Sequence, residues 1–368
     1  MRRALYWLLA FVTSFLLTAG GIEAFMKQSG AVPPLTSYFH PELGLYSRPN
    51  VKLLKFKEGF FIGESYSGSR YGEDYPKSKP RGAYRIALIG DSFVEGLDVF
   101  SRHHFRAFME RDLRAHFDPD VQVLNFGRGN STLRTSYHYL LSHVLEYEPD
   151  LVLFFLEERD RDPTFWPGRT QFVLEDGDLV LDYGWRESRN YKLFHWLDAQ
   201  PVLNHYIELS SLGLLNRATT NIRNRSPGRI FLGKFHAWLF PRRVGEPDLP
   251  PDAEEVSELS RRILEELVAL GDEGRAEVVF VLRALTPIPA LKRALGEIGA
   301  DTIDLGGLWA DETGLLKSSG IHSRYWKATR VTRGHWNHEG HREVGRALAD
   351  ALIERLGGTI DSRRQPSS

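Results

Sequence analysis

Short apolar runs recur five times along this chain, separated by longer amphipathic stretches. The runs lie at 85–89, 121–126, 151–155, 277–282 and 302–305. Continuous apolar runs of this length predict strands that are buried on both faces of a sheet. Apolar residues at helical spacing predict helices over 101–117, 133–147, 253–270, 287–298 and 337–356. This alternation predicts an α/β fold with a doubly wound, five-stranded parallel sheet.

Local signals set the expected ends of several elements. Ser101 and Asn337 have the side chains that helix N-caps favour, and Gly357-Gly358 predicts the end of the last helix. The stretch FVLEDGDLVLDY predicts a hairpin that turns at Asp176-Gly177.

The N-terminus carries an apolar run from Ala4 to about Ile22, preceded by Arg2 and Arg3. A run of this length is close to the roughly 20 residues that span a bilayer. The two arginines predict a cytoplasmic N-terminus, with the remainder outside the cell membrane. We therefore expect a single-pass signal anchor over 1–26. The alternative is a cleaved signal sequence that leaves a secreted or periplasmic protein.

The remaining chain divides by composition and rhythm. Residues 27–82 are rich in Pro, Gly, Ser and Tyr, which predicts a membrane-proximal linker and edge segment. The main domain is expected over 83–358, with an insertion at about 163–252 where the strand–helix rhythm breaks. Residues 359–368 are expected to form a disordered tail.

The amino-acid composition limits the kinds of partner and reactive group that this protein can have. The 368 residues are 42% hydrophobic, with a formal net charge of −1 and no cysteine. The charge gives no indication of a nucleic-acid partner. Absence of cysteine excludes disulfides, thiolate metal sites and cysteine nucleophiles.

The strongest chemical signal is Ser92, in the stretch RIALIGDSFVEG. It follows the first predicted strand, at the sheet edge where ligands and reacting groups sit in open α/β folds. Such a serine is a candidate nucleophile, although Gly-Asp-Ser is also ordinary turn chemistry. A serine nucleophile needs a base and oxyanion donors. The backbone amides of Gly127 and Gly129 are candidate donors, and a tight strand-to-helix turn explains these glycines equally well.

His335, in RGHWNHEGH, is the best candidate base because it lies in a glycine-flanked loop before the last helix. His338 and His341 are expected on the surface of that helix. The spacing of the three histidines does not place them on one face, so no metal site is expected. No cofactor is expected either.

With these motifs the chain resembles the SGNH/GDSL hydrolases, in particular the membrane-anchored bacterial type, in which a segment like ELGLYSRPN precedes the GDSF block. The resemblance implies a flavodoxin-like sheet and acyl-ester hydrolysis. It implies Ser92 as nucleophile and His335 as base. The amides of Ser92 and Gly129, or less closely Gly127, would serve the oxyanion. Asp91 and Asn130 would be neighbours of the site.

Two positions depart from the family pattern. Glu158 falls where the family has an oxyanion-binding asparagine, and a carboxylate only accepts hydrogen bonds. Arg333 falls where the family has the aspartate that orients the histidine, and an arginine cannot accept the imidazole proton. Three outcomes follow: a Ser92–His335 dyad with slow or specialised activity, a new role for Glu158 with Arg333 or His335, or an inactive scaffold.

The sequence therefore predicts an extracytoplasmic serine hydrolase that acts on ester bonds through a Ser92 acyl-enzyme. The expected substrate is a small-molecule or glycan acyl ester, such as an acetyl group on a cell-envelope glycan. The alternative is a catalytically degenerate binding or assembly protein of the cell envelope.

Overall fold

The structure is a computed structural model that describes residues 2–29, 37–55, 61–65, 74–97, 99–117, 120–163, 168–198, 255–283, 288–309 and 335–364. Most of the expected insertion, the position of Arg333 and residues 365–368 lie outside the described residues. The chain divides into two compact units. One comprises Met1–Val51, Pro167–Arg169 and Tyr183–Val244, and the other comprises Lys52–Trp166, Thr170–Asp182 and Gly245–Ser368.

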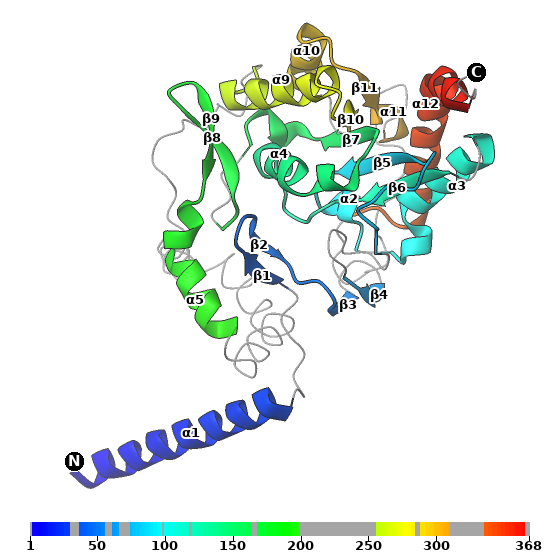
Figure 1. Cartoon of the computed structure of the whole chain (residues 1–368). Coiled ribbons are helices and arrows are strands. Elements are labelled where there is room, and N and C mark those ends of the chain that lie inside the picture. The colour runs from blue at the N-terminus through cyan, green and yellow to red at the C-terminus, as the bar shows by residue number, and fades with distance from the viewer. Residues whose placement is uncertain are drawn as a thin grey trace. The chain divides into compact units, whose positions relative to one another are not determined.

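The second unit is built on a five-stranded parallel sheet (Figure 1). Its strands are β5 (Tyr84–Ile89), β6 (Val121–Asn125), β7 (Leu151–Leu156), β10 (Glu277–Leu282) and β11 (Thr302–Asp304). They are arranged in the order β11-β10-β7-β5-β6, and every neighbouring pair is parallel. Numbered along the chain and read from the β6 edge, this is the flavodoxin-like order 2-1-3-4-5. The predicted fold class is confirmed.

Helices cover both faces of the sheet. On one face, α3 (Phe105–Phe117) and α12 (His338–Arg364) share a buried apolar cluster with alternate strand residues, including Ile86 and Leu88. On the other face, α4 (Leu133–Ser142) and α9 (Glu258–Asp272) lie against the sheet and contact each other, as Figure 1 shows. The rings of Phe154 and Phe280, from neighbouring strands, are 6.3 Å apart. Strands β5, β7 and β10 are buried almost throughout, which is why they read as continuous apolar runs, whereas the edge strand β11 is largely exposed.

The remaining described elements are short, apart from α1. The helices are α1 (Arg2–Ser29), α2 (Ser92–Glu95), α5 (Arg189–Asp198), α10 (Pro289–Glu297) and α11 (Gly306–Trp309). The 3-10 turns are η1 (Ser101–His103), η2 (Val144–Tyr147), η3 (Glu158–Arg161) and η4 (Gly184–Glu187). The antiparallel pairs are β1 (Ser37–His40) with β2 (Gly44–Ser47), β3 (Lys52–Lys55) with β4 (Phe61–Glu64), and β8 (Gln171–Glu175) with β9 (Asp178–Asp182).

The structure tests four expected ends and turns. Asn337 caps α12 as expected, because its Oδ1 accepts from the Gly340 amide at 2.9 Å. The hairpin turn at Asp176-Gly177 is confirmed, and both residues have positive φ, as a two-residue turn of this type requires. Ser101 does not cap α3, because it opens the 3-10 turn η1 instead. The expected stop at Gly357-Gly358 is wrong, since α12 continues to Arg364. Glycine disfavours a helix by only about 1 kcal/mol per residue and does not by itself end one.

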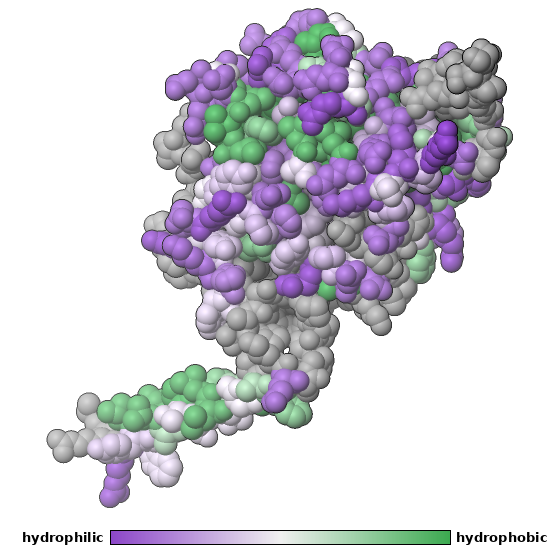
Figure 2. Space-filling model, viewed as in Figure 1, coloured by the Kyte–Doolittle hydropathy of each residue, from purple (hydrophilic) through white to green (hydrophobic). Residues whose placement is uncertain are grey.

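Helix α1 is apolar and exposed along its length (Figure 2). Its stretch Leu5–Ile22 has a mean hydropathy of 1.8, and none of it is buried. By length and composition, α1 is suited to cross a membrane or to serve as a signal sequence.

Two histidines, His104 and His341, are buried together beside α2, with ring centroids 4.8 Å apart. Nδ1 of His104 accepts from the Arg106 amide at 3.1 Å, and its Nε2 lies 3.0 Å from the Val94 carbonyl. Nδ1 of His341 accepts from the Phe105 amide at 3.2 Å. The expected surface position of His341 is therefore wrong, because the first turns of α12 pack against α3.

This pair predicts sensitivity to acid. Burial, with Arg106 nearby, lowers the pKa of His104 to about 3, and burial holds the pKa of His341 well below its usual 6.5. The unfolded chain takes up protons on both histidines near pH 6.5, whereas the folded chain does not. The contribution of this pair to the free energy of unfolding should therefore fall below about pH 6.5, by up to about 1.4 kcal/mol per pH unit for each histidine. Asp160, whose pKa is raised by burial to about 7, contributes in the opposite sense, and the two histidines together outweigh it.

Chemical denaturation at several values between about pH 4 and 7 measures this slope. His104→Asn keeps an acceptor for the Arg106 amide but has no group that titrates at this position. It should therefore remove the contribution of one histidine to the dependence of the unfolding free energy on pH. His116→Asn changes an exposed histidine of α3 and is the control. An equal slope in His104→Asn and the wild type would contradict the prediction.

Candidate active site

Ser92 is presented by a tight turn between β5 and α2. Asp91 caps the N-terminus of α2, and its Oδ1 accepts from the Phe93 amide at 2.9 Å. A Cβ on Gly90 would overlap the side chain of Val94, so the turn has room only for glycine there. The turn places Ser92 as the first residue of α2, half-buried at the carboxyl end of β5.

The structure brings His335 to Ser92 across 243 positions of sequence. Nε2 of His335 lies 2.8 Å from Oγ of Ser92. The imidazole packs against Phe93, with ring centroids 4.8 Å apart, and the next residue, Trp336, is buried against the same phenyl ring. This is the separation that a nucleophile and its general base need.

Gly127 has a packing role. A Cβ there would fall inside contact distance of the Val94 and Glu95 backbone, so only glycine allows this loop to approach α2 so closely. Its amide donates to Oδ1 of Asn125 at 2.9 Å. The structure thus favours the tight-turn explanation for this glycine over the oxyanion role.

Gly129 lies closer to the nucleophile. A Cβ built on it would be 3.9 Å from Cβ of Ser92. Its amide, however, donates to Oε2 of the buried Glu95 at 2.9 Å. The expected oxyanion donor is therefore engaged by a carboxylate of the GDSFVEG segment. Asn130, the next residue, is exposed and has a φ of 57°.

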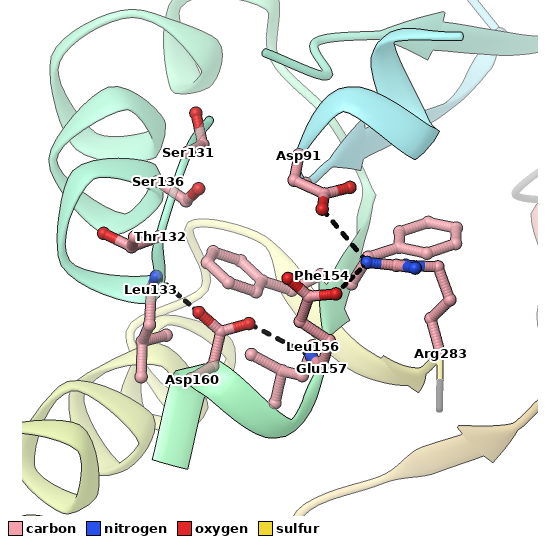
Figure 3. A pocket seen from close by; sticks show the side chains of 12 residues that line it. Asp91, Ser131, Thr132, Leu133, Ser136, Phe154, Leu156, Glu157, Asp160 and Arg283 are labelled. Atoms are coloured by element: carbon pink, nitrogen blue, oxygen red, sulfur yellow. Dashed lines mark hydrogen bonds and ion pairs between the residues drawn. The ribbon is translucent and has the colours of Figure 1, made fainter. Parts of the chain in front are cut away.

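Asp91 belongs to a charged cluster of four side chains, with Glu157, Arg159 and Arg283. Figure 3 shows Asp91 and Glu157 together with Arg283. Oδ2 of Asp91 accepts from Nη2 of Arg159 at 2.7 Å and from Nη2 of Arg283 at 3.0 Å. Glu157 pairs with both arginines. The Arg283 guanidinium also stacks on Phe93, 3.9 Å from the ring centroid. Two cations and two carboxylates thus hold the turn that carries Ser92.

Asp160 links this cluster to α4. Its two carboxylate oxygens accept from the amides of Leu133, at 2.9 Å, and Glu157, at 3.0 Å, as Figure 3 shows. Burial, with the nearby charge of Glu157, raises the pKa of Asp160 to about 7. A small cavity of about 10 Å³ lies between Asp160 and Asp91. Asp160 fixes the N-terminus of α4 to the end of β7.

The two departures from the family pattern have different outcomes. Glu158, expected beside the oxyanion, is about half exposed and pairs with Arg161 in its own 3-10 turn, at 3.3 Å. The neighbouring residue, Arg159, is the one that reaches the nucleophile turn. The expected contacts of Arg333 lie outside the described residues.

Sequence reasoning did not find the roles of Glu95, Arg159 and Arg283. Glu95 stands inside the GDSFVEG segment, so its place near Ser92 was visible, but its contact with Gly129 depends on loop geometry. Arg283 follows β10 directly, at the same sheet edge as Ser92. That position was the available signal.

The sheet order, with GDSF after its first strand and GHWN before its last helix, gives the chain an SGNH hydrolase-like fold. Solved structures similar to it include a Desulfitobacterium hafniense protein described as lipolytic and of the G-D-S-L family. It has 11% identity and a TM-score of 0.38, over 73% of this chain and 99% of that chain.

Two others have 13% identity each. They are a lipase/acylhydrolase from Enterococcus faecalis (TM-score 0.35, 74% of this chain and 96% of that chain) and the acetylxylan esterase Axe2 from Geobacillus stearothermophilus (0.33, 76% and 97%). No family model and no curated protein matches the sequence. The chemistry of the site therefore has to be argued from this chain's own residues.

Proposed function

We propose that this protein is a serine hydrolase that cleaves acyl esters through a covalent Ser92 intermediate. The contact of 2.8 Å between Ser92 Oγ and His335 Nε2 carries the proposal. His335 takes the proton from Oγ as the new C–O bond forms, and then gives it to the leaving alcohol. Water, deprotonated by His335 in turn, releases the acid and restores Ser92.

The substrate that we propose is an acyl ester of the cell envelope, with acetylated glycans as the first candidates. The apolar helix α1 supports this, because it suits an anchor that would hold the site near the envelope. The proposed orientation places the site on the extracytoplasmic side.

A fluorophosphonate probe tests the proposed nucleophile. In this reaction Oγ of Ser92 bonds to phosphorus, fluoride leaves, and His335 takes the proton. We expect the full-length chain in detergent to be labelled, Ser92→Ala to stay unlabelled, and Ser101→Ala, at a nearby serine outside the site, to label like the wild type. A folded wild type that fails to label, or equal labelling of Ser92→Ala, would reject the proposal.

The second candidate, a degenerate binding protein of the envelope, is favoured by one observation. The amides of Gly127 and Gly129 both donate to side chains of the chain itself. An unlabelled wild type whose melting temperature rises with acetylated oligosaccharides would support this candidate instead.

A further inference from the structure

The guanidinium of Arg159, in the charged cluster around Asp91, uses only part of its capacity to donate hydrogen bonds. Nε of Arg159 pairs with Glu157, and its Nη2 donates to Asp91 at 2.7 Å and to the Ser131 carbonyl at 3.2 Å. Within the described part of the chain, Nη1 of Arg159 makes no hydrogen bond. The side chain is 41% exposed.

The anchors of Arg159 lie on both segments that flank the nucleophile. Asp91 directly precedes Ser92, and Ser131 is two residues beyond Gly129 in the loop beside it. Arg283 contacts the same carboxylates but differs in exposure, since its side chain is only 7% exposed and lies on Phe93. Of the two arginines, Arg159 is the one that can reach a bound molecule.

We propose that Arg159 is a catalytic residue, whose Nη1 donates to the oxyanion that forms when Ser92 attacks an ester. The inference rests on the proposed function. The site needs such a donor, because the amides of Gly127 and Gly129 already donate to the side chains of Asn125 and Glu95. As the C–O bond forms, the carbonyl electron pair moves onto oxygen and the Ser92 proton moves to His335. Arg159 stays protonated throughout.

Two physical effects make Arg159 suited to this role. Its guanidinium is held by three contacts before any substrate binds, so little reorganisation accompanies the reaction. A charged donor also forms a stronger hydrogen bond to an anion than a neutral one does. The carboxylates of Asp91 and Glu157 balance the positive charges of Arg159 and Arg283. The proposed stabilisation of the oxyanion therefore comes from one hydrogen bond donated by Arg159, and not from a net positive charge of the cluster.

The test compares matched variants in fluorophosphonate labelling, in which a phosphoryl oxygen takes the place of the oxyanion. Arg159→Met should lower the first-order labelling rate by about 10²–10³-fold, with a small change in the probe concentration at half-saturation. Arg159→Lys should also be slow, because one ammonium cannot hold Asp91 and reach the oxyanion together. Arg283→Lys, which alters the same anchor of Asp91, should slow labelling at least about tenfold less than Arg159→Lys does.

Melting temperatures confirm that each variant is folded. An unlabelled wild type overturns the proposed function and this inference together. If the wild type labels and folded Arg159→Met labels at the same rate, the inference alone is overturned. The same holds if Arg283→Lys slows labelling as much as Arg159→Lys does, because the role of both arginines is then to hold Asp91.

Discussion

Replacing His335 with alanine is expected to slow labelling of Ser92, and hydrolysis of any ester substrate, by about 10²–10⁴-fold. Without the imidazole 2.8 Å from Oγ, the hydroxyl has no side chain positioned to take its proton. A serine hydroxyl is a poor nucleophile until a base removes that proton. Measuring the rate against pH should show that the His335→Ala enzyme loses the rise in activity that the imidazole gives the wild type.

His338→Ala is the control for this experiment, since His338 is an exposed histidine three positions further along the chain. It should keep the wild-type rate to within about twofold. Both proteins should melt near the wild-type temperature, because neither side chain belongs to the apolar cluster around α3 and α12. A folded His335→Ala variant with full activity would show that another group is the base.

Arg85→Met is expected to lower the free energy of unfolding by about 3–5 kcal/mol. Arg85 is fully buried in β5, and its guanidinium donates to Gln122 and to four backbone carbonyls. These carbonyls belong to Pro76, Lys77, Ser78 and Tyr147. Methionine fills similar space but leaves the carbonyls without their donors, and buried unsatisfied polar groups are costly.

Denaturant titration measures this loss. Arg111→Met is the matched control, because the Arg111 side chain is 59% exposed, pairs with its neighbour Asp112 and lies over the ring of Phe108 at the surface of α3. It should change stability by less than about 1 kcal/mol. A similar, small effect in Arg85→Met would mean that the 76–78 segment contributes little to the stability of the sheet.

Local pattern predicted most of the fold. Strands β5, β7 and β10 are buried on both faces, so most of their residues are apolar and the strands were visible as short apolar runs. The buried Arg85 in β5 and the largely exposed edge strand β11 depart from this pattern. The hairpin turn at Asp176-Gly177 was visible because only a few residue types adopt positive φ readily. That the sheet is parallel and doubly wound follows from the same alternation together with the rules that govern crossover connections, whereas its flavodoxin-like order was implied only by the family resemblance.

The local signals failed where distant contacts decide the outcome. His341 looks like a surface residue by its neighbours in sequence, yet its burial comes from α3, more than 200 positions away. Ser101 resembles an N-cap, but the backbone there forms a 3-10 turn before α3 begins. The glycine pair at 357–358 resembles a stop, but α12 continues through it.

The candidate site shows the same division. The sequence by itself determined that Ser92 follows the first strand and that His335 precedes the last helix, because each stands in a local motif with its own turn chemistry. Only the tertiary structure decided that the two side chains meet. It also decided that Glu95 takes the Gly129 amide and that Arg159, rather than Glu158, reaches Asp91. Such choices depend on distances of a few ångströms between segments that are far apart in the chain, and a pattern of residue types does not encode those distances.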